Sequence, residues 1–462
     1  MKFAKSILCI GAGYVGGPTM AVIAAKCPEC KVTVVDINED RIRGWNSDKL
    51  PIYEPGLDAI VKQCRGKNLF FSTDIPQGIR DSEIIFVSVN TPTKTFGEGA
   101  GMASDVQYLE RTARDILAHS RSSKIVIEKS TIPVKTAQAM ENIFLSSPRS
   151  GVHFEVLSNP EFLAEGTAIR DLENPDRVLI GSRETPTGIT ARQTLVDIYA
   201  QWVPRERIIT SNIWSSELSK LVANAFLAQR VSSINAVSAL CEKTQADVRE
   251  ISRAIGADSR IGAKFLNAGI GFGGSCFKKD ILNLVYLCRS YGLEEVANYW
   301  ESVVKINEYQ LGRFFSKMLK AMLGTMSGKR ICLYGFAFKA DTGDTRESPA
   351  KYLTHKLLAE NAMVTISDPQ ANDNAKIDLA GYGEAIQYIA DPLDAARDAD
   401  ALVVMTDWDI YRKIDYAQVF QKMRKPAFIF DGRNILDHKK CFELGFNVFP
   451  IGQQELTHLK YE

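Results

Sequence analysis

The chain has 462 residues, a length sufficient for about three domains of roughly 150 residues with sizeable hydrophobic cores. Its 45% hydrophobic and 24% charged residues are typical of globular proteins and exclude an intrinsically disordered chain. Because 56 Lys and Arg residues balance 55 Asp and Glu residues, the net charge of +1 gives no general attraction to nucleic acid or to an anionic membrane.

The expected elements fall into three parts along the chain. The first part alternates short β-rich runs with helical stretches, which predicts a parallel sheet covered by helices, with strands at 7–10, 32–35, 84–89, 125–128, 155–157 and 178–180. The second part has almost no strand signal and contains helices at about 215–241 and 293–323. The third part returns to strands, at 330–335, 364–367, 401–406 and 427–430.

This order predicts an α/β protein in which two Rossmann-like domains with parallel-sheet cores are joined by a central all-α domain with a long connecting helix. The N-terminal domain is expected to bind the dinucleotide and the C-terminal domain to be a second βα-type domain. The expected boundaries are 1–211, 212–324 and 325–462.

A short strand ending at Ile10 leads into Gly11-Ala12-Gly13-Tyr14-Val15-Gly16, a GxGxxG sequence that precedes a helical stretch. In such a turn the first glycine permits the tight turn, the second lets a pyrophosphate approach the backbone, and the third brings helix and strand together. The next strand ends in Asp36, 20 residues after Gly16, where a carboxylate binds the adenosine ribose and repels a 2′-phosphate. We therefore predict NAD as the cofactor, and the alternative is a glycine-rich turn with an unrelated aspartate.

The cysteines and the N-terminal segment indicate a cytoplasmic protein. Nine cysteines, odd in number and widely scattered, do not suggest a disulfide framework, and free thiols suit a reducing compartment. Cys27 and Cys30 form a CxxC pair without further ligands at zinc-finger spacing, so we expect no metal site. Glycines and Pro18 interrupt the uncharged stretch between Lys5 and Lys26, which argues against a signal peptide or a membrane span.

Polar residues follow three further predicted strands. The segments are 90–93 (NTPT), 129–131 (KST) and 158–161 (SNPE). Ligands of open α/β sheets bind beyond the carboxyl ends of the strands, so these residues are candidates for ligand contacts. Each segment alone could be a turn or a helix cap.

The stretch 269–280 carries four glycines within six residues and then Ser275, Cys276 and Asp280. Glycines let the backbone come close to a ligand, and Ser275 can cap a following helix. Cys276 is then expected in the first helical turn, where free N–H groups and the helix dipole favour the thiolate. Asp280 lies one turn further on the same face, where it could hold a water. We expect a reactive thiol here, and the other eight cysteines are expected to be small buried hydrophobic residues.

Two i,i+4 pairs add polar groups to apolar surroundings. Lys220 and Asn224 lie on a largely apolar helical stretch, which indicates either a lined cavity or a structural hydrogen-bonded pair. A lysine near a reacting oxygen can stabilise an alkoxide. Glu161 and Glu165 form the second pair, which alone would also be consistent with solvated helix charges. None of the five histidines lies in these motifs, which argues against a dehydrogenase with a histidine base or a catalytic zinc.

Together these motifs closely resemble the UDP-glucose 6-dehydrogenases of the UDP-glucose/GDP-mannose dehydrogenase family, in their animal-like form. The matching stretches run nearly from end to end: 11–18 (GAGYVGGP), 51–56 (PIYEPG), 89–94 (VNTPTK), 159–166 (NPEFLAEG), 214–230 (WSSELSKLVANAFLAQR), 271–280 (GFGGSCFKKD), 335–348 (GFAFKADTGDTRES) and 430–433 (FDGR). The set is specific, because no single motif requires the others.

The resemblance implies oxidation of UDP-glucose to UDP-glucuronate with reduction of two NAD+ and no release of the aldehyde. Cys276 would form a thiohemiacetal and then a thioester, which water activated by Glu161 would hydrolyse. Lys220 and Asp280 would manage the alcohol proton and the oxyanion, and Thr131 and Asn224 would position water or substrate. This agrees with the residue chemistry, because an aldehyde has no hydride to give until a nucleophile adds to it.

The resemblance also implies binding residues. The NAD contacts would be Gly11, Ala12, Gly13, Tyr14, Val15, Gly16, Asp36, Arg41, Val89, Asn90, Thr91, Pro92, Thr93, Ser130, Thr131, Ile132, Glu165 and Arg346. The UDP-glucose contacts would be Glu161, Phe162, Leu163, Ala164, Glu165, Lys220, Asn224, Arg260, Asn267, Gly271, Phe272, Gly273, Phe338, Lys339 and Arg433. Arg260 would reach the active site of a neighbouring subunit, so self-association as a homodimer or a hexamer of dimers is expected. The C-terminal domain would hold the UDP end.

Some features depart from the animal enzymes, and other interpretations exist. Residues 267–270 read NAGI where the animal enzymes have Lys-Ala-Ser-Val, so allosteric behaviour is not carried over. The long polar C-terminal tail of the animal form is also not seen. The alternatives are a sister dehydrogenase acting on GDP-mannose or UDP-N-acetylmannosamine, a β-hydroxyacid dehydrogenase that oxidises once, and an inactive NAD-binding assembly protein. The last need not retain Cys276, Lys220, Asp280 and Glu161 together.

Overall fold

The computed structural model describes residues 3–147 and 151–459. The chain divides into two compact units, each built around one sheet: unit 1 comprises Met1–Ala223 and Leu282–Gly292, and unit 2 comprises Asn224–Ile281 and Leu293–Glu462. Two helices, α9 (Ile213–Thr244) and α11 (Phe277–Ser290), contribute residues to both units. Each unit is described by itself.

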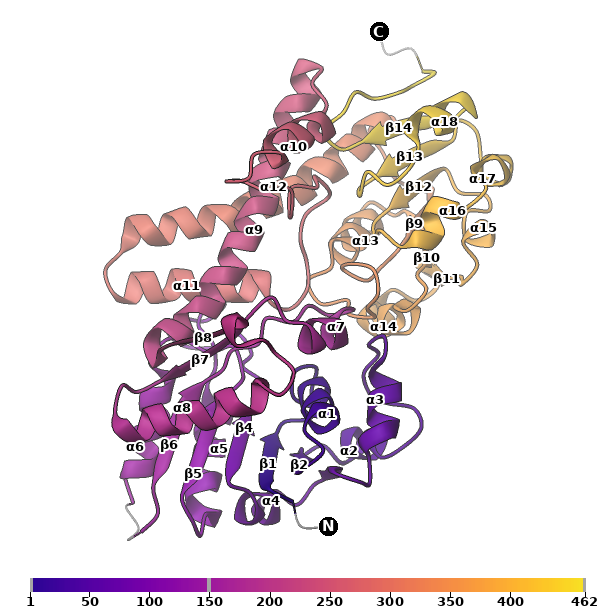
Figure 1. The fold of residues 1–462 in the computed structure, drawn as a ribbon. Helices are drawn as coiled ribbons and strands as arrows, with labels where there is room; N and C mark the ends of the chain where they lie inside the picture. Colours follow the sequence, from indigo (N-terminus) through magenta and orange to yellow (C-terminus); the bar gives the residue numbers. More distant parts are fainter. Residues whose placement is uncertain (1–2, 148–150, 460–462) are drawn as a thin grey trace. The chain divides into compact units, whose positions relative to one another are not determined.

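Unit 1 contains an eight-stranded sheet in the order β3-β2-β1-β4-β5-β6-β7-β8 (Figure 1). The strands are β1 (Lys5–Ile10), β2 (Cys30–Val35), β3 (Leu69–Ser72), β4 (Ile84–Val87), β5 (Lys124–Glu128), β6 (Phe154–Ser158), β7 (Val178–Ser182) and β8 (Ile208–Asn212). Its helices are α1 (Gly16–Lys26), α2 (Glu39–Trp45), α3 (Leu57–Cys64), α4 (Ile75–Asp81), α5 (Gln107–His119), α6 (Thr136–Leu145), α7 (Ala168–Glu173) and α8 (Pro186–Tyr199), with a 3-10 turn at Arg205–Arg207. The first six strands in this order are parallel, whereas β7 pairs with β6 in the antiparallel direction.

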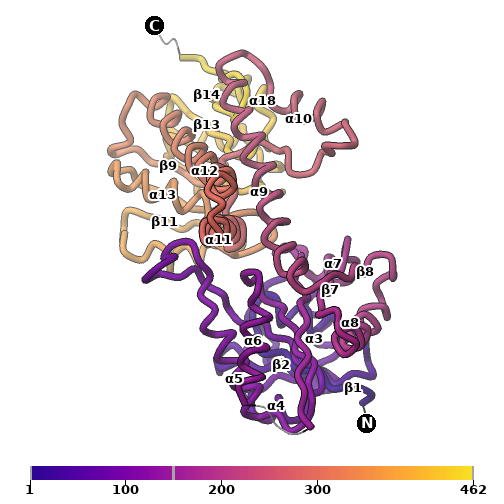
Figure 2. Tube along the Cα trace, turned by 90° about the vertical axis from the view of Figure 1, so that its left-hand side faces the viewer, coloured from indigo at the N-terminus to yellow at the C-terminus, as the bar shows by residue number. Residues whose placement is uncertain are grey.

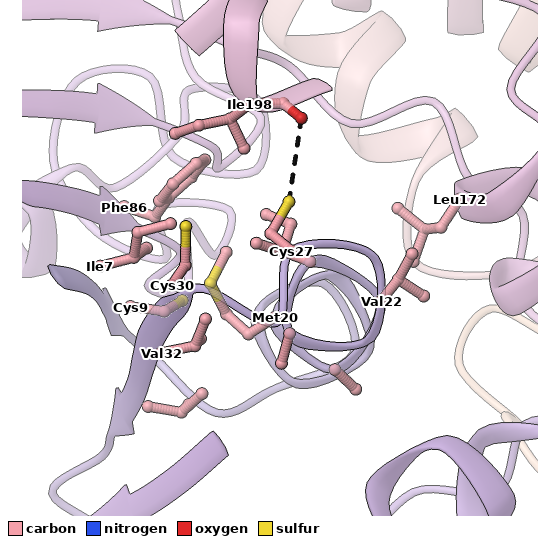
Figure 3. Packing of buried hydrophobic residues seen from close by; sticks show 14 of the residues in the cluster. Ile7, Cys9, Met20, Val22, Cys27, Cys30, Val32, Phe86, Leu172 and Ile198 are labelled. Atoms are coloured by element: carbon pink, nitrogen blue, oxygen red, sulfur yellow. Dashed lines mark hydrogen bonds between the residues drawn. The ribbon is translucent and has the colours of Figure 1, made fainter. Parts of the chain in front are cut away.

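Both faces of the central strands of this sheet are buried, as a parallel sheet covered by helices requires. Along β1, Ile7 and Cys9 belong to the core shared with α1, α2, α3, α7 and α8, while Leu8 and Ile10 belong to the core shared with α4, α5 and α6. This alternation follows from the two-residue period of a strand. Figure 3 shows part of the first core, where the Cys27 thiol donates to the Ile198 carbonyl at 3.9 Å.

Unit 2 contains a six-stranded, fully parallel sheet in the order β11-β10-β9-β12-β13-β14. Its strands are β9 (Arg330–Tyr334), β10 (Met363–Ser367), β11 (Ile386–Tyr388), β12 (Ala401–Val404), β13 (Phe428–Asp431) and β14 (Asn447–Pro450). Its other helices are α10 (Val248–Gly256), α12 (Glu294–Ala321), α13 (Pro349–Ala359), α14 (Asn372–Asp378), α15 (Pro392–Ala395), α16 (Asp409–Lys413), α17 (Tyr416–Lys422) and α18 (His438–Glu443), with a 3-10 segment at Ala380–Ala385. Figures 1 and 2 both show α18 beside β13 and β14.

The predicted fold class is confirmed, since two parallel-sheet α/β regions flank a helical region that contains α9 and the long α12. The ten predicted strands are present within a few residues of their expected bounds. Four strands were missed, namely β3, β8, β11 and β14. All four are edge strands of three to five residues, too short for a clear hydrophobic pattern. The antiparallel direction of β7 departs from the expected parallel sheet.

Candidate functional site

The GxGxxG turn lies between β1 and α1, and each of its glycines meets a different steric demand. Gly11 has φ +110°, and a Cβ there would lie 2.2 Å from the Ser88 carbonyl oxygen. A Cβ at Gly16 would lie 2.0 Å from the Gly11 carbonyl oxygen, so the start of α1 can pack against the strand end only with glycine. Nothing lies within 4 Å of the Cβ position of Gly13. The open side of the turn is therefore at the glycine expected to face a pyrophosphate.

Asp36 follows β2 and is buried, and its carboxylate is oriented by three donors. Its Oδ2 accepts from the Ala12 backbone N–H at 2.9 Å and pairs with Arg41 Nη1 at 3.0 Å, and its Oδ1 accepts from the Asn38 N–H at 2.9 Å. The bond to Ala12 connects the strand end directly to the glycine turn. Since a carboxylate has about four acceptor sites, this one can still accept a ribose hydroxyl, and the residues present fit NAD.

The loops after β4 and β5 are tied together by side chains from the predicted polar segments. Thr91 Oγ1 donates to the Thr131 carbonyl at 2.8 Å, and Ser130 Oγ donates to the Val89 carbonyl at 2.7 Å. These bonds fix the backbone of two predicted NAD-contacting loops at the carboxyl edge of the sheet. Thr131 itself is partly accessible.

Glu161 follows β6 and is held from three directions. Its Oε1 accepts from the backbone N–H groups of Phe162, at 2.8 Å, and Leu163, at 3.0 Å, and its Oε2 forms an ion pair with Lys129 Nζ at 2.8 Å. Burial by itself raises the pKa of Glu161, but the Lys129 charge and the backbone donors outweigh burial and hold the pKa below its ordinary value. Glu161 is therefore a carboxylate at neutral pH, as a residue that accepts a proton from water must be.

Lys220 lies in the second turn of α9, and its ammonium is 5.5 Å from the ring centroid of Phe162. The same ring is also contacted by Arg177, whose guanidinium carbon is 3.8 Å from the centroid. Lys220 is buried, with 8% exposure. In unit 1 the structure thus brings Lys220 close to the 161–165 segment, as the predicted roles require.

In unit 2, Cys276 is exposed, and it differs in this from the other eight cysteines, all of which are buried. The expected position needs a correction of one residue, because α11 begins at Phe277 and Cys276 immediately precedes it. The Cys276 carbonyl accepts from the Asp280 N–H at 2.9 Å, so Cys276 occupies the capping position that was expected for Ser275. Cys276 still stands at the end of α11 where the N–H groups of the first turn are free, and its Sγ lies 3.5 Å from Ser275 Oγ.

Asp280 is almost completely buried and is fixed by two neighbours. Asn224 Nδ2, from α9, donates to its Oδ2 at 2.6 Å, and Lys279 Nζ lies 3.3 Å from its Oδ1. The i,i+4 partner of Lys220 is therefore hydrogen-bonded to the carboxylate one turn after the thiol. The sequence analysis gave these residues related roles but predicted no contact between them. The structure shows that Asn224 and Asp280 are in contact.

The glycine stretch before the thiol is held by backbone contacts that larger residues would break. Gly271 has φ +127°, and a Cβ there would lie 2.7 Å from Asn307 Oδ1, which accepts from the Phe272 N–H at 2.8 Å. Arg433 donates to the carbonyls of Gly271, at 3.3 Å, and Phe338, at 3.0 Å. Three predicted substrate-binding segments thus meet at one guanidinium in unit 2.

Other predicted residues show no such convergence. Arg260 is exposed and pairs with Asp258 at 2.7 Å, and Arg346 is exposed and pairs with Asp344 at 2.6 Å. Asn267 is exposed as well. Their predicted binding roles stay predictions.

Three supporting residues were missed by the sequence reasoning. Lys129 was noted only as part of a polar strand end. Glu54, within the PIYEPG motif, is buried and accepts from the N–H groups of Gly166, at 2.7 Å, and Ala168, at 3.1 Å, so it fixes the segment after Glu161. The Trp45 ring would lie 2.1 Å from a Cβ at Gly17, which explains a fourth glycine beside the fingerprint. For Glu54, the signal that could have been used is its charge within the PIYEPG motif, whose neighbouring residues are mostly apolar.

The two sheets and the glycine turn define a dinucleotide-binding α/β protein with a second Rossmann-like sheet. The chain belongs to the UDP-glucose/GDP-mannose dehydrogenase family. It matches the family's NAD binding domain over residues 5–203, its central domain over 214–309 and its UDP binding domain over 332–438.

Individual relatives agree with this assignment. The chain is 58% identical to UDP-glucose 6-dehydrogenase 1 of Glycine max over 465 residues, covering 97% of each chain. It is 57% identical to UDP-glucose 6-dehydrogenase 1 of Arabidopsis thaliana over 473 residues, covering 98% of each chain. These relatives are plant proteins, so they support the family and do not address the animal-like form.

Solved structures show the same fold. A UDP-glucose dehydrogenase from Pyrobaculum islandicum superimposes with a TM-score of 0.83 at 29% identity, covering 96% of this chain and 98% of the other. A UDP-D-ManNAc dehydrogenase from Pyrococcus horikoshii gives a TM-score of 0.80 at 26% identity, covering 97% and 99%. Within the described residues, no helix is long and apolar enough to cross a membrane. The same residues contain no cluster of three or more His, Cys, Asp or Glu side chains suited to a metal ion.

Proposed function

We propose that this protein oxidises UDP-glucose to UDP-glucuronate with NAD+ as the oxidant. The observation that carries the proposal is the single exposed thiol, Cys276, placed directly before α11 and one turn from the buried Asp280. The proposal is supported by 58% identity to a UDP-glucose 6-dehydrogenase along 97% of the chain. The solved UDP-glucose and UDP-D-ManNAc dehydrogenases are 29% and 26% identical to the chain, so the preference for UDP-glucose over the sister substrate rests on the plant relatives.

The thiol explains how two oxidations can occur at one carbon. Addition of Cys276 Sγ to the aldehyde carbon forms a C–S bond and gives a thiohemiacetal, the species that can lose a second hydride to become a thioester. NAD+, when bound, supplies the hydride acceptor for both oxidations. Water then attacks the thioester carbon, the C–S bond breaks, and the thiol and the acid are released. The aldehyde stays bound because it is covalently attached.

The remaining residues move protons and orient groups. Lys220 and Asp280 would take up the proton of the alcohol and stabilise the oxyanion, and Glu161 would accept the proton of the attacking water. Asn224 supports this by its 2.6 Å bond to Asp280, and Thr131 would position the water or the sugar. Removing a single donor to a developing oxyanion typically costs about 10²–10³ in rate.

The binding and assembly assignments belong to the same proposal. The boundaries 1–211, 212–324 and 325–462 rest on the order of the predicted elements, and the cytoplasmic location rests on the scattered free cysteines. The NAD and sugar contacts given above follow from the family resemblance. So does self-association, in which the exposed Arg260 would serve a neighbouring subunit. An animal-like form is part of the proposal on the motif evidence alone.

The test is a count of NADH formed per sugar nucleotide consumed, with purified protein. Two NADH per UDP-glucose, and far lower rates with GDP-mannose and UDP-N-acetylmannosamine, are expected. One NADH per substrate would favour a single oxidation of the β-hydroxyacid dehydrogenase type, and no NADH would favour an inactive NAD-binding protein.

Cys276→Ala is the matching variant, and it should form no UDP-glucuronate while it still binds UDP-glucose. Cys288→Ala is its control, because Cys288 lies on α11, the helix that Cys276 immediately precedes, but is buried and has no assigned role. Normal acid production by Cys276→Ala would contradict the covalent mechanism.

A further inference from the structure

Lys129 is a buried lysine whose charge the proposed reaction does not use. It immediately follows β5 and is 3% exposed. Its Nζ lies 2.8 Å from Glu161 Oε2, 3.0 Å from Asn159 Oδ1 and 3.3 Å from the Tyr199 hydroxyl. The ammonium thus donates hydrogen bonds to Asn159 and Tyr199, and Glu161 is its ion-pair partner. A buried lysine is costly unless it is paired, so the contact to Glu161 is the one that retains its charge.

The groups that face this pair come from four elements. Tyr199, from α8, donates its hydroxyl to Asn159 Oδ1 at 2.8 Å and so fixes the amide that receives Lys129. Asn159, at the end of β6, anchors to the Leu179 carbonyl at 2.8 Å. Cys9, on β1, is a buried thiol, and burial raises its pKa to about 12, partly countered by Lys129. Lys220, on α9, approaches the neighbouring Phe162 ring.

We propose that Lys129 is a positioning residue for the hydrolysis of the thioester, acting by holding Glu161 as an oriented carboxylate. This inference rests on the proposed function, in which Glu161 accepts the proton of water. In this role, the 2.8 Å ion pair with Lys129 keeps Glu161 ionised and holds its carboxylate in one orientation.

The geometry explains why both properties depend on Lys129. The Phe162 and Leu163 N–H groups both bond to Oε1, so Lys129 is the group that faces the other carboxylate oxygen, Oε2. The Glu161 side chain is 14% exposed, but its Oε2 atom is buried, so the ion pair with Lys129 is what compensates the charge on that oxygen. Without the ammonium, burial would favour the protonated acid, and a protonated Glu161 cannot accept a proton.

The test compares Lys129→Met with Lys124→Met. Both lysines are 3% exposed and stand at or next to β5, but Lys124 donates to the Ser82 carbonyl and to Ser122 Oγ rather than to a carboxylate. We expect Lys129→Met to lower kcat about 10²-fold or more, as loss of a general base does, and to shift the acidic limb of its pH profile upward by at least one pH unit. Lys124→Met should leave the pH profile in place.

Intact-mass spectrometry of Lys129→Met during turnover with UDP-glucose should reveal a covalent UDP-glucuronyl adduct on Cys276, because hydrolysis is the slowed step. If Lys129 acts through Glu161, the double variant Lys129→Met/Glu161→Gln should be no slower than Glu161→Gln. Thermal unfolding is a readout independent of turnover. The ion pair should make the parent protein lose stability as the pH falls, and this loss should be smaller in Lys129→Met. Lys124→Met should lose stability with falling pH as the parent does.

Each result bears on one of the two claims. An unshifted pH profile, or additive effects of Lys129→Met and Glu161→Gln, would overturn the role of Lys129. That role is also overturned if Glu161→Gln accumulates the adduct and Lys129→Met does not, and in that case the proposed function still stands. If neither variant nor the parent protein forms an adduct on Cys276, the covalent mechanism itself fails, and the role of Lys129 is overturned with it.

Discussion

The first strand of each sheet leads into a turn that begins with a glycine of positive φ, but the two turns differ in the side chains that fill them. Gly11 after β1 has φ +110°, and Gly335 after β9 has φ +97°. An aspartate at the end of the next strand bonds back to each turn: Asp36 accepts from the Ala12 N–H at 2.9 Å, and Asp368 accepts from the Phe336 N–H at 2.7 Å. The two sheets also share their order, since β3-β2-β1-β4 corresponds to β11-β10-β9-β12.

The difference lies in what occupies the turn. In unit 1 the space beside Gly13 is open. In unit 2 the equivalent segment carries the fully buried Phe336 and Ala337, and Trp408 Nε1 donates to Asp368 at 3.2 Å. Side chains therefore fill the turn after β9. In the turn after β1 the space beside Gly13 is left open. A shared topology supplies the turn and the aspartate, and the presence of small residues decides whether a pyrophosphate can enter.

The largest expected effect comes from closing the open turn. Gly13→Val should reduce NAD affinity by about 100-fold or more, because the added side chain occupies the approach of the pyrophosphate. It should leave the melting temperature nearly unchanged, since nothing lies within 4 Å of the Cβ position and φ there is not positive. Calorimetric titration with NAD and thermal unfolding provide the two measurements.

Gly335→Ala is the matched change in unit 2. A Cβ at Gly335 would lie 2.3 Å from Thr406, and its φ is positive, so this variant should lose stability without a specific loss of NAD affinity. Retained NAD binding in Gly13→Val would contradict the assignment of the open turn.

Substitutions of Asp36 and Asp368 should likewise distinguish an effect on NAD affinity from an effect on stability. Asp36→Ala is expected to weaken NAD binding with little change in UDP affinity, because its carboxylate is the group proposed to bind the adenosine ribose. Asp368→Ala should instead lower the free energy of unfolding by about 1–3 kcal/mol, since it leaves the Phe336 and Ala337 N–H groups and the Trp408 indole without their acceptor. Titrations with NAD and with UDP, alongside urea unfolding, distinguish the outcomes. Equal losses of NAD and UDP affinity in Asp36→Ala would undermine the separate assignment of the two nucleotides.

The sequence sufficed for the parts of the molecule that local patterns determine. The buried strands of both sheets appear as continuous apolar runs, and the Gly11–Gly16 turn with Asp36 has a fixed spacing, so both were predicted. The pairing of Asn224 with Asp280, and of Lys129 with Glu161, joins residues 56 and 32 positions apart. Such contacts depend on tertiary packing, and no local period encodes them. The one-residue shift at Cys276 reflects the usual uncertainty of helix ends.

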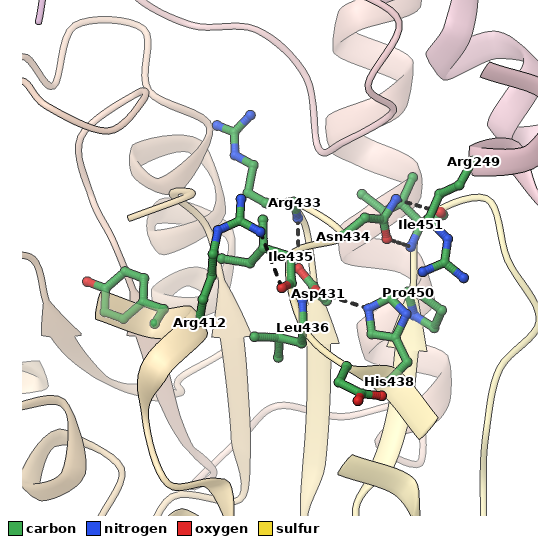
Figure 4. A network of polar contacts seen from close by, with 12 residues as sticks. Arg249, Arg412, Asp431, Arg433, Asn434, Ile435, Leu436, His438, Pro450 and Ile451 are labelled. Atoms are coloured by element: carbon green, nitrogen blue, oxygen red, sulfur yellow. Dashed lines mark hydrogen bonds and ion pairs between the residues drawn. The ribbon is translucent and has the colours of Figure 1, made fainter. Parts of the chain in front are cut away.

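The two units also differ in how they accommodate a buried carboxylate, and this difference has the smallest expected effect. In unit 2, Asp431 is completely buried and accepts from the Arg433 and Leu436 N–H groups, at 3.0 and 2.9 Å, and contacts His438 Nε2 at 2.9 Å (Figure 4). In unit 1, Glu128 at the end of β5 is 1% exposed, and neither of its oxygens receives a hydrogen bond from a described donor. It lies beside Glu217 of α9, which accepts from the N–H groups that begin α6.

This pair should make unit 1 sensitive to pH. Burial, more than the neighbouring carboxylate, raises the pKa of Glu128, and burial raises the pKa of Glu217 to about 7, against the lowering effect of its backbone donors and Arg183. An acid whose pKa is raised by folding keeps its proton in the folded state while the unfolded chain releases it, so stability should decrease as pH rises from about 4.5 to about 7.

Glu128→Gln keeps the shape of the side chain and removes one of the two titrating groups, so it should flatten this decrease, measured as melting temperature between about pH 5 and 8 (a range set by the titration window). Because the amide can donate to Glu217, which the ionised carboxylate cannot, the variant should also be more stable than the parent at the alkaline end, by roughly 2–4 °C. Asp431→Asn is the counterpart in unit 2, where replacing an acceptor of three donors should lower stability at every pH. A parent protein whose melting temperature stays as flat through this range as that of Glu128→Gln would show that Glu128 does not contribute to the pH dependence.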